Sequence, residues 1–231
     1  MCGRFAATTD PALLAAALDA VDETGSAGRG PNYNVAPSAE IATVVSDESR
    51  RRLRLMRWGL LPPWARQKAG DKPAHPLINA RAETLTTSPA FRAAAKHRRC
   101  LIPMDGYYEW RPNPDHPGRG RKTPFYFFRP DGAPLLVGGI WEPDRGAAVI
   151  TTDAVGEFAG VHSRMPLVLA QRDADRWLDP GAPAPADLLA GAPDTAAMAM
   201  REVSTLVNRV ANNGPELIEP AGPGDQPVGL F

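Results

Sequence analysis

Hydrophobic residues in this chain fall mainly in short runs that are separated by Pro, Gly, Asn and Asp. Runs of four to eight residues rich in β-branched and aromatic side chains predict β-strands. Nine runs fit this pattern: residues 40–45, 52–58, 77–83, 100–103, 106–110, 124–128, 134–141, 147–152 and 165–170. The chain is therefore expected to consist largely of short strands.

Helical patterns are fewer. Asp10 followed by Pro11 predicts a helix over residues 11–21, because Asp caps free backbone amides and Pro fits the first helical position. Ser88 followed by Pro89 predicts a second helix over residues 90–99, and DLLAGA (187–192) a short third one. Many strands and few helices predict an α+β fold with an antiparallel, barrel-like β core decorated with short helices.

The 231 residues suit a single domain, which we place at residues 1–220, with a mobile tail at 221–231. No apolar run approaches the ~20 residues of a membrane span, and no secretory signal begins the chain. A cytoplasmic protein without membrane contact is expected. Two cysteines without a CxxC pair predict neither disulfides nor a zinc site, so no metal or cofactor is expected.

Charge is unevenly distributed along the chain although the formal net charge is zero. Residues 1–130 carry 20 Lys and Arg against 12 Asp and Glu, whereas residues 131–231 carry 6 against 14. A basic half is typical of proteins that bind a polyanion such as DNA. An exposed basic strand with no such partner would have the same composition.

Cys2 is the most informative single residue. Removal of the initiator methionine before a small residue would leave a chain that begins with cysteine, bearing an amine and a thiol on neighbouring carbons. Both groups titrate not far above neutral pH in their ordinary state. Such a residue can attack an acyl group through its thiol. Alternatively, its amine can condense with an aldehyde, after which the thiol closes a five-membered thiazolidine ring.

Three other segments contain candidate chemistry. In LINARAET (77–84), Asn79, Arg81 and Glu83 share one face if the segment is a strand, and an arginine there could grip a phosphate. In DGYYEW (105–110), Glu109 lies between two aromatic residues that would desolvate it and raise its pKa. In VHSRMP (161–166), His162 is a candidate for proton transfer.

Together these segments resemble one family, that of the SOS-response-associated peptidase (SRAP) or abasic-site processing proteins. The resemblance covers roughly residues 2–220 and consists of eight motifs in order: MCGRF, YNVAPS, RWGLLPPWA, INARAET, PMDGYYEW, VITT, HSRMP and VSTLVN. It implies the fold expected above. It also implies a sensor of abasic sites in single-stranded DNA that forms a covalent thiazolidine crosslink, with associated lyase and autopeptidase activities in the response to DNA damage.

The resemblance implies four catalytic residues. Cys2 would be the nucleophile once Met1 is removed, and Asn79 would hold the amine end and the sugar-phosphate. Glu109 would assist proton transfers, and His162 would act as a general acid linked to strand cleavage and crosslink reversal. The motif histidine of the family is often followed by an acidic residue, whereas Ser163 stands here, which leaves the tuning of His162 open.

DNA contacts are also implied. Phosphate-contacting positions match Arg4, Arg81 and Arg164, and positions lining the DNA groove match Asn34, Pro37, Trp58 and Thr151. Aromatic residues such as Trp58 and Trp64 would stack on neighbouring bases or wedge a junction of single and double strands. A monomer suffices for this activity, with localisation at the nucleoid when DNA is bound.

Two other functions compete with this one. An N-terminal-nucleophile hydrolase, such as a glutamine amidotransferase, would also use Cys2 and its amine, with an oxyanion hole. It leaves the basic half of the chain unexplained. A non-catalytic module for single-stranded DNA would use the arginines and aromatics alone, and would bind normally without Cys2.

Overall fold

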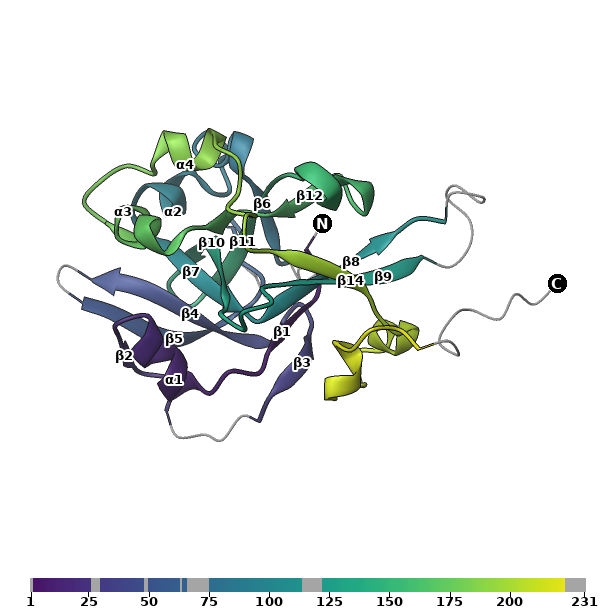
Figure 1. The fold of residues 1–231 in the computed structure, drawn as a ribbon. Helices are drawn as coiled ribbons and strands as arrows, with labels where there is room; N and C mark the ends of the chain where they lie inside the picture. The colour runs from purple at the N-terminus through teal and green to yellow at the C-terminus, as the bar shows by residue number, and fades with distance from the viewer. Residues whose placement is uncertain are drawn as a thin grey trace, which may run out of the picture.

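The computed structural model describes residues 2–25, 30–47, 50–62, 64–65, 75–113 and 122–222. Within these ranges the chain is a mixed α+β structure in which strands predominate (Figure 1). The strands form two sheets of five and nine strands, mostly antiparallel. Neither sheet closes on itself, so the term barrel-like describes the core only loosely.

The five-stranded sheet has the order β14-β9-β8-β1-β3. Its members in chain order are β1 (Phe5–Ala7), β3 (Asn32–Val35), β8 (Gly106–Arg111), β9 (Thr123–Phe128) and β14 (Ala199–Glu202). A side chain at Gly106 would place its Cβ 2.4 Å from the backbone oxygen of Phe127. Only glycine therefore fits at the first position of β8.

The nine-stranded sheet has the order β12-β11-β10-β7-β4-β5-β2, with β13 paired to β10 and β6 paired to β11. Its members in chain order are β2 (Ala20–Asp22), β4 (Glu40–Asp47), β5 (Arg50–Arg57), β6 (Asn79–Arg81), β7 (Arg99–Met104), β10 (Leu135–Glu142), β11 (Gly146–Asp153), β12 (Arg164–Pro166) and β13 (Val168–Leu169). An isolated bridge between Trp58 and Ala147 brings the end of β5 next to β11.

The α-helices are short: α1 (Pro11–Ala17), α2 (Arg92–His97), α3 (Ala174–Leu178) and α4 (Ala186–Ala190). Figure 1 shows α2, α3 and α4 together at one end of the molecule, away from the β8–β9 hairpin. The cap predicted for α1 is confirmed, since the Asp10 carboxylate accepts from the Ala12 amide at 2.9 Å. The cap predicted at Ser88 is wrong, because α2 begins at Arg92 and no side chain caps it.

Strand alternation divides the apolar residues of the nine-stranded sheet between two clusters. Val44 and Leu101 face a cluster that includes α1, α2 and α3. Val45 and Ile102 face the opposite cluster, which contains Phe5, Tyr107 and other residues of the five-stranded sheet. The period of two expected for strands therefore buries both faces of this sheet, which explains its nearly continuous apolar runs.

Two predicted strands differ from the structure. The run at residues 77–83 forms only the three residues of β6 and then a 3-10 helix (Ala82–Thr84). The run at 165–170 is interrupted between β12 and β13, where the Leu167 amide bonds to Ile150 and its carbonyl accepts from Gly138. β6 and β12 each pair with β11 over three residues, and β13 pairs with β10 over two. The predicted tail lies largely outside the described residues.

Candidate active site

The N-terminal residues run along β8 into β1. The Tyr108 amide donates to the Arg4 carbonyl at 2.9 Å, and Phe5 pairs with Tyr107 in an antiparallel register. β1 begins three residues after Cys2, and the charge of Glu109 on β8 acts on the Cys2 thiol. Two segments more than a hundred residues apart are thus brought together by backbone pairing.

Cys2 is fully buried in the apolar cluster between the two sheets. The Asn79 side-chain amide donates to the Cys2 carbonyl at 2.9 Å. Asn79 lies on β6, which pairs in parallel with β11 at Val149. The nine-stranded sheet therefore supplies Asn79 and the five-stranded sheet supplies Glu109, so that the candidate site lies where the two sheets meet.

The Cys2 thiol, the Tyr107 phenol and the Glu109 carboxylate interact electrostatically at this junction. Burial raises the pKa of the Cys2 thiol well above its ordinary value, and the Glu109 charge raises it further. Burial likewise raises the pKa of the Tyr107 phenol, with smaller contributions from Cys2 and Glu109. Glu109 itself is only 4% exposed. The thiol is therefore protonated at rest, and a reaction that uses its sulfur needs a base close by.

Tyr107 is a neighbour of the site that sequence reasoning missed. Its ring stacks on Phe127, with ring centroids 4.6 Å apart. The sequence contained the information needed to find Tyr107, because alternation along the predicted strand puts Tyr107 and Glu109 on one face. Glu109 is buried, but the predicted burial by Tyr108 and Trp110 is wrong, because those two side chains project to the opposite face of β8.

His162 follows a 3-10 helix (Gly156–Gly160) and precedes β12. The Arg164 amide donates to His162 Nδ1 at 2.9 Å. The same nitrogen lies 3.1 Å from the Arg164 carbonyl oxygen, so its donor or acceptor role depends on the tautomer of the ring. β12 and β6 both pair with β11, so the same strand supports His162 and Asn79.

The three predicted phosphate-contacting arginines differ in their environment. The Arg164 guanidinium bonds Glu83 at 2.6 Å and Asp153 at 2.7 Å, so its charge is already compensated. Arg4 donates only to uncharged oxygens, Asn34 Oδ1 at 2.7 Å and the Val207 carbonyl at 2.9 Å. Arg81 is exposed. Neither Arg4 nor Arg81 forms a salt bridge with another described residue, so both retain a positive charge for an anionic ligand.

Three of the four residues predicted to line a DNA groove are buried in the structure. Asn34 is 2% exposed, and Trp58 and Thr151 are fully buried. The Trp58 indole donates to the Ile78 carbonyl at 3.0 Å and packs on Phe5, so neither face of its ring is open to a base.

These buried residues support the site from within. The Asn34 amide nitrogen donates to three backbone carbonyls of residues 207–212. Of the predicted groove residues, only Pro37 is exposed, and Trp64, at 60% exposed, is the aromatic that remains available for stacking. Cys100, the second cysteine, is buried in the core.

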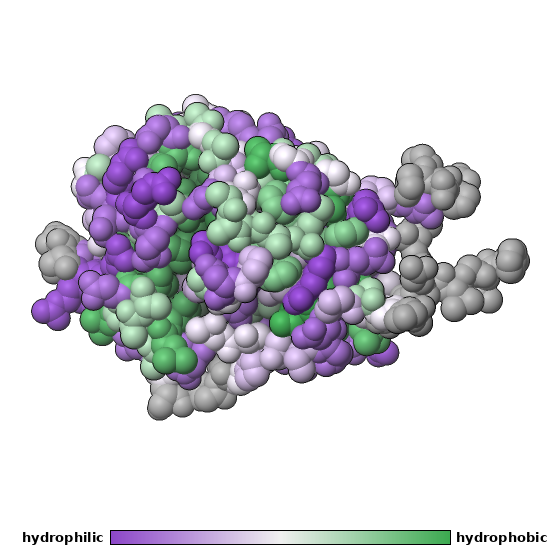
Figure 2. All heavy atoms as spheres, in the orientation of Figure 1, coloured by the Kyte–Doolittle hydropathy of each residue, from purple (hydrophilic) through white to green (hydrophobic). Residues whose placement is uncertain are grey.

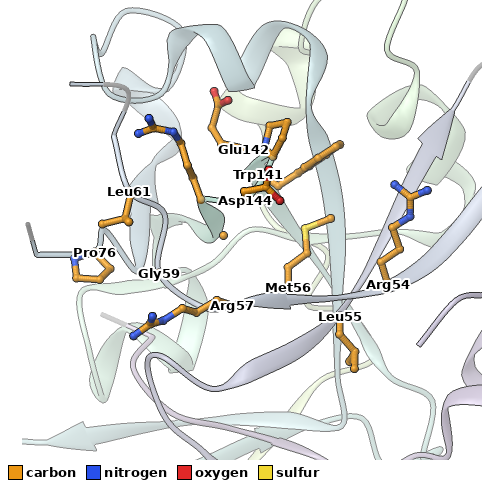
Figure 3. A pocket seen from close by; sticks show the side chains of 13 residues that line it. Arg54, Leu55, Met56, Arg57, Gly59, Leu61, Pro76, Trp141, Glu142 and Asp144 are labelled. Carbon is orange, nitrogen blue, oxygen red and sulfur yellow. The ribbon is translucent and has the colours of Figure 1, made fainter. Parts of the chain in front are cut away.

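A cavity of about 560 Å³ lies elsewhere, between the end of β5 and the β10–β11 turn (Figure 3). Met56 and Trp141 give it an apolar side, and Arg57 and Asp144 are among its charged lining residues. None of the predicted site residues lines it.

Among the described residues, no three His, Cys, Asp or Glu side chains gather in a way that would hold a metal ion. In the same part of the chain, none of the helices combines the length and apolar composition that crossing a bilayer requires.

Several known proteins resemble this chain in sequence or in fold. The "Abasic site processing protein YoqW" of Bacillus subtilis (strain 168) is 38% identical over 204 residues, covering 82% of this chain and 86% of that protein. The "Abasic site processing protein YoaM" of the same organism is 35% identical over 235 residues, covering 95% and 98%.

A crystal structure of a protein from Bacteroides thetaiotaomicron superposes with a TM-score of 0.76 at 23% identity, covering 95% of this chain and all of that one, and shares the fold. The sequence profile of the family described as SOS response associated peptidase (SRAP) matches residues 1–210. The chain therefore belongs to the SRAP family.

Proposed function

We propose that this protein processes abasic sites in DNA, and that it captures them in single-stranded DNA as a covalent thiazolidine on Cys2. Relatives named as abasic site processing proteins support the DNA-processing role. The observation that carries the covalent mechanism is the convergence of Cys2, Asn79 and Glu109 at the junction of the two sheets. Removal of Met1 is a condition, because the Cys2 nitrogen otherwise lies in a peptide bond.

The chemistry uses the open-chain aldehyde of an abasic sugar. The Cys2 amine adds to the aldehyde carbon and water leaves, which forms a Schiff base. The thiol then adds to the same carbon, and its proton goes to the nitrogen. One carbon–nitrogen and one carbon–sulfur bond are formed and one water is released, without an oxidant or a reductant.

Each residue has a role in this sequence. The Asn79 amide nitrogen holds the Cys2 carbonyl, while its Oδ1 is buried and accepts no hydrogen bond from other described residues. Oδ1 is thus placed to accept from the newly formed amine. Glu109 receives the thiol proton and returns it to the nitrogen or to the leaving water. His162 acts as a general acid in strand cleavage and in reversal of the crosslink.

Two arginines supply affinity. Arg81 and Arg4, which form no salt bridge with another described residue, bind phosphates on either side of the lesion, in a manner that depends on salt and not on sequence. Arg164 holds Glu83 and Asp153 and orders the end of β11 beside His162. A phosphate can bind Arg164 only if it competes with these two carboxylates for the guanidinium.

The test uses the Met1-free protein and single-stranded DNA with one abasic site, resolved on a denaturing gel. We expect a shifted band that survives denaturation. DNA whose abasic aldehyde has first been reduced to the alcohol is the matched control and should give no such band. A band of equal intensity with reduced DNA would contradict aldehyde capture. Absence of both bands would favour the hydrolase or the plain binding module.

Arg81→Ala is expected to weaken binding to all single-stranded sequences alike and to lower the slope of log K against log salt by about one. The reason is the loss of one positive charge at an exposed position. Binding is measured by fluorescence anisotropy at several salt concentrations. Arg92→Ala, an exposed arginine on α2, is the control and should leave the slope unchanged. A loss confined to some sequences would contradict phosphate contact.

A further inference from the structure

Arg111 lies at the end of β8, on the face of the five-stranded sheet that carries Glu109. Residues two apart on a strand share a face, so Tyr107, Glu109 and Arg111 form a row. Tyr107 belongs to the apolar cluster that contains Cys2. Phe125, the partner of Glu109 on β9, belongs to the same cluster. The row therefore runs from the buried site outward to an exposed arginine.

The Arg111 guanidinium has a defined position over an aromatic ring. Its Cζ lies 4.5 Å from the centroid of the Phe125 ring. A cation at such a distance from a ring face is attracted by the electrons of the ring. Phe125 is only 7% exposed, so the core holds the ring in place. An arginine ordered in this way loses little conformational freedom when it binds a ligand.

The charge of Arg111 suits an anionic ligand. Arg111 forms no salt bridge with another described residue. Glu109, on the same face, carries a carboxylate that repels the phosphates of any strand that reaches Cys2, and a cation at the end of the row offsets this repulsion. Figure 2 shows hydrophilic residues at the right of the molecule, next to where Figure 1 draws the β8–β9 hairpin.

The spacing along β8 matches the reach of a single nucleotide. Two residues of a strand span about 7 Å, and this is the separation between the backbones of Glu109 and Arg111. The phosphates of an abasic nucleotide are attached to its sugar through the 3′ and 5′ oxygens, so both lie close to the carbon that Cys2 attacks. The edge of a stacked guanidinium can donate to two oxygens of one phosphate.

We infer that Arg111 binds a phosphate that directly flanks the captured abasic sugar, and thereby holds the lesion against Cys2 and Glu109. This inference rests on the proposed function, because it assumes that Cys2 takes the sugar of an abasic site. A phosphate has two free oxygens and can accept from two arginines. Arg111 therefore adds to the contacts of Arg4 and Arg81 and does not replace them.

The test measures reversible affinity for single-stranded DNA with one reduced, non-reactive abasic site, by fluorescence anisotropy. Arg111→Ala should bind about fivefold more weakly than the parent and lower the salt slope by about one. Arg111→Lys keeps the charge but not the planar group stacked on Phe125, so it should keep the slope and recover only part of the affinity. Arg92→Ala, at an exposed position on α2, is the matched control and should bind as the parent does.

A double-mutant cycle locates the phosphate. Two further DNAs each carry a neutral methylphosphonate in place of one phosphate, on the 5′ or on the 3′ side of the lesion. On at least one of them Arg111→Ala should bind as well as the parent, because the charge that Arg111 contacts is gone. Equal affinity of Arg111→Ala and parent for the unmodified DNA would overturn the inference, and so would a loss that neither methylphosphonate removes.

The proposed function is tested apart from this inference. The covalent yield of the parent on reactive abasic DNA is measured in parallel, at saturating protein. A normal yield together with no effect of Arg111→Ala on affinity would remove only the role of Arg111. Absence of a covalent product would contradict the proposed function, whatever Arg111 contributes to affinity. Melting curves check that each variant folds.

Discussion

A Cys2→Ala variant is expected to form no adduct with abasic DNA that survives denaturation, while its reversible affinity for the same DNA stays within a few-fold of that of the parent. Without sulfur the thiazolidine ring cannot close, and a Schiff base alone hydrolyses. Alanine is also small enough for Met1 to be removed, so the variant keeps a free α-amine. The measurement is a denaturing gel beside an anisotropy titration.

Adding a reductant separates the two chemical steps, formation of the Schiff base and closure of the thiazolidine ring. Borohydride converts a Schiff base into a stable secondary amine, so Cys2→Ala should yield an adduct in its presence and none in its absence. The parent should yield one in both conditions. This pattern would assign the first bond to the amine and the second to the thiol.

Cys100→Ala is the matched control, because Cys100 is also a fully buried free thiol in the same apolar cluster. It should crosslink as the parent does once a melting curve shows that it folds. A stable adduct of Cys2→Ala without reductant, at the yield of the parent, would show that another nucleophile reacts and would remove Cys2 from the mechanism.

Glu109→Gln is expected to slow crosslink formation by about a hundredfold, the lower end of the range for a lost general acid–base group. Glutamine keeps the shape of the side chain and removes only its ability to take and return a proton. Reversible binding should be nearly unchanged, since a negative charge does not attract DNA. The measurement is the single-turnover rate with protein in excess over DNA.

The direction of this effect is diagnostic because two consequences of the substitution oppose each other. The Glu109 charge raises the pKa of the Cys2 thiol, second only to burial. Its removal therefore makes the thiolate easier to form, which by itself would accelerate the reaction. A slower variant shows that proton transfer outweighs this electrostatic effect. Glu157→Gln, at an exposed position, is the control. An unchanged or faster rate for Glu109→Gln would exclude Glu109 as the base.

Local structure was largely predictable from the sequence. Alternating and continuous apolar runs located most strands to within a few residues, because residues buried on a pleated sheet must repeat with a period of two. The Asp10–Pro11 start of α1 was predictable for a similar reason, since capping involves only neighbouring residues. Errors arose at residues 77–83, where β6 pairs with β11 over only three residues, and at Ser88, which does not cap α2.

The candidate site was predictable only in part. The motifs singled out Cys2, Asn79 and Glu109, and the structure places these three at one junction. Their relation to His162 and the compensation of Arg164 by Glu83 depend on contacts between segments about eighty residues apart. No local sequence pattern encodes such contacts. The sequence therefore could not distinguish Arg164, whose charge is compensated, from Arg81, since both are arginines in candidate motifs.

The sequence by itself determined the order of the elements, the chemistry available at the N-terminus and membership of a family. Only the tertiary structure decided which side chains face inward. Alternation along a strand states that neighbouring residues face opposite ways, but which face is covered depends on the sheet that packs against it. Trp58, Thr151 and Asn34 are therefore buried supports of the core, and Tyr107 becomes a neighbour of the nucleophile because β8 pairs with β1.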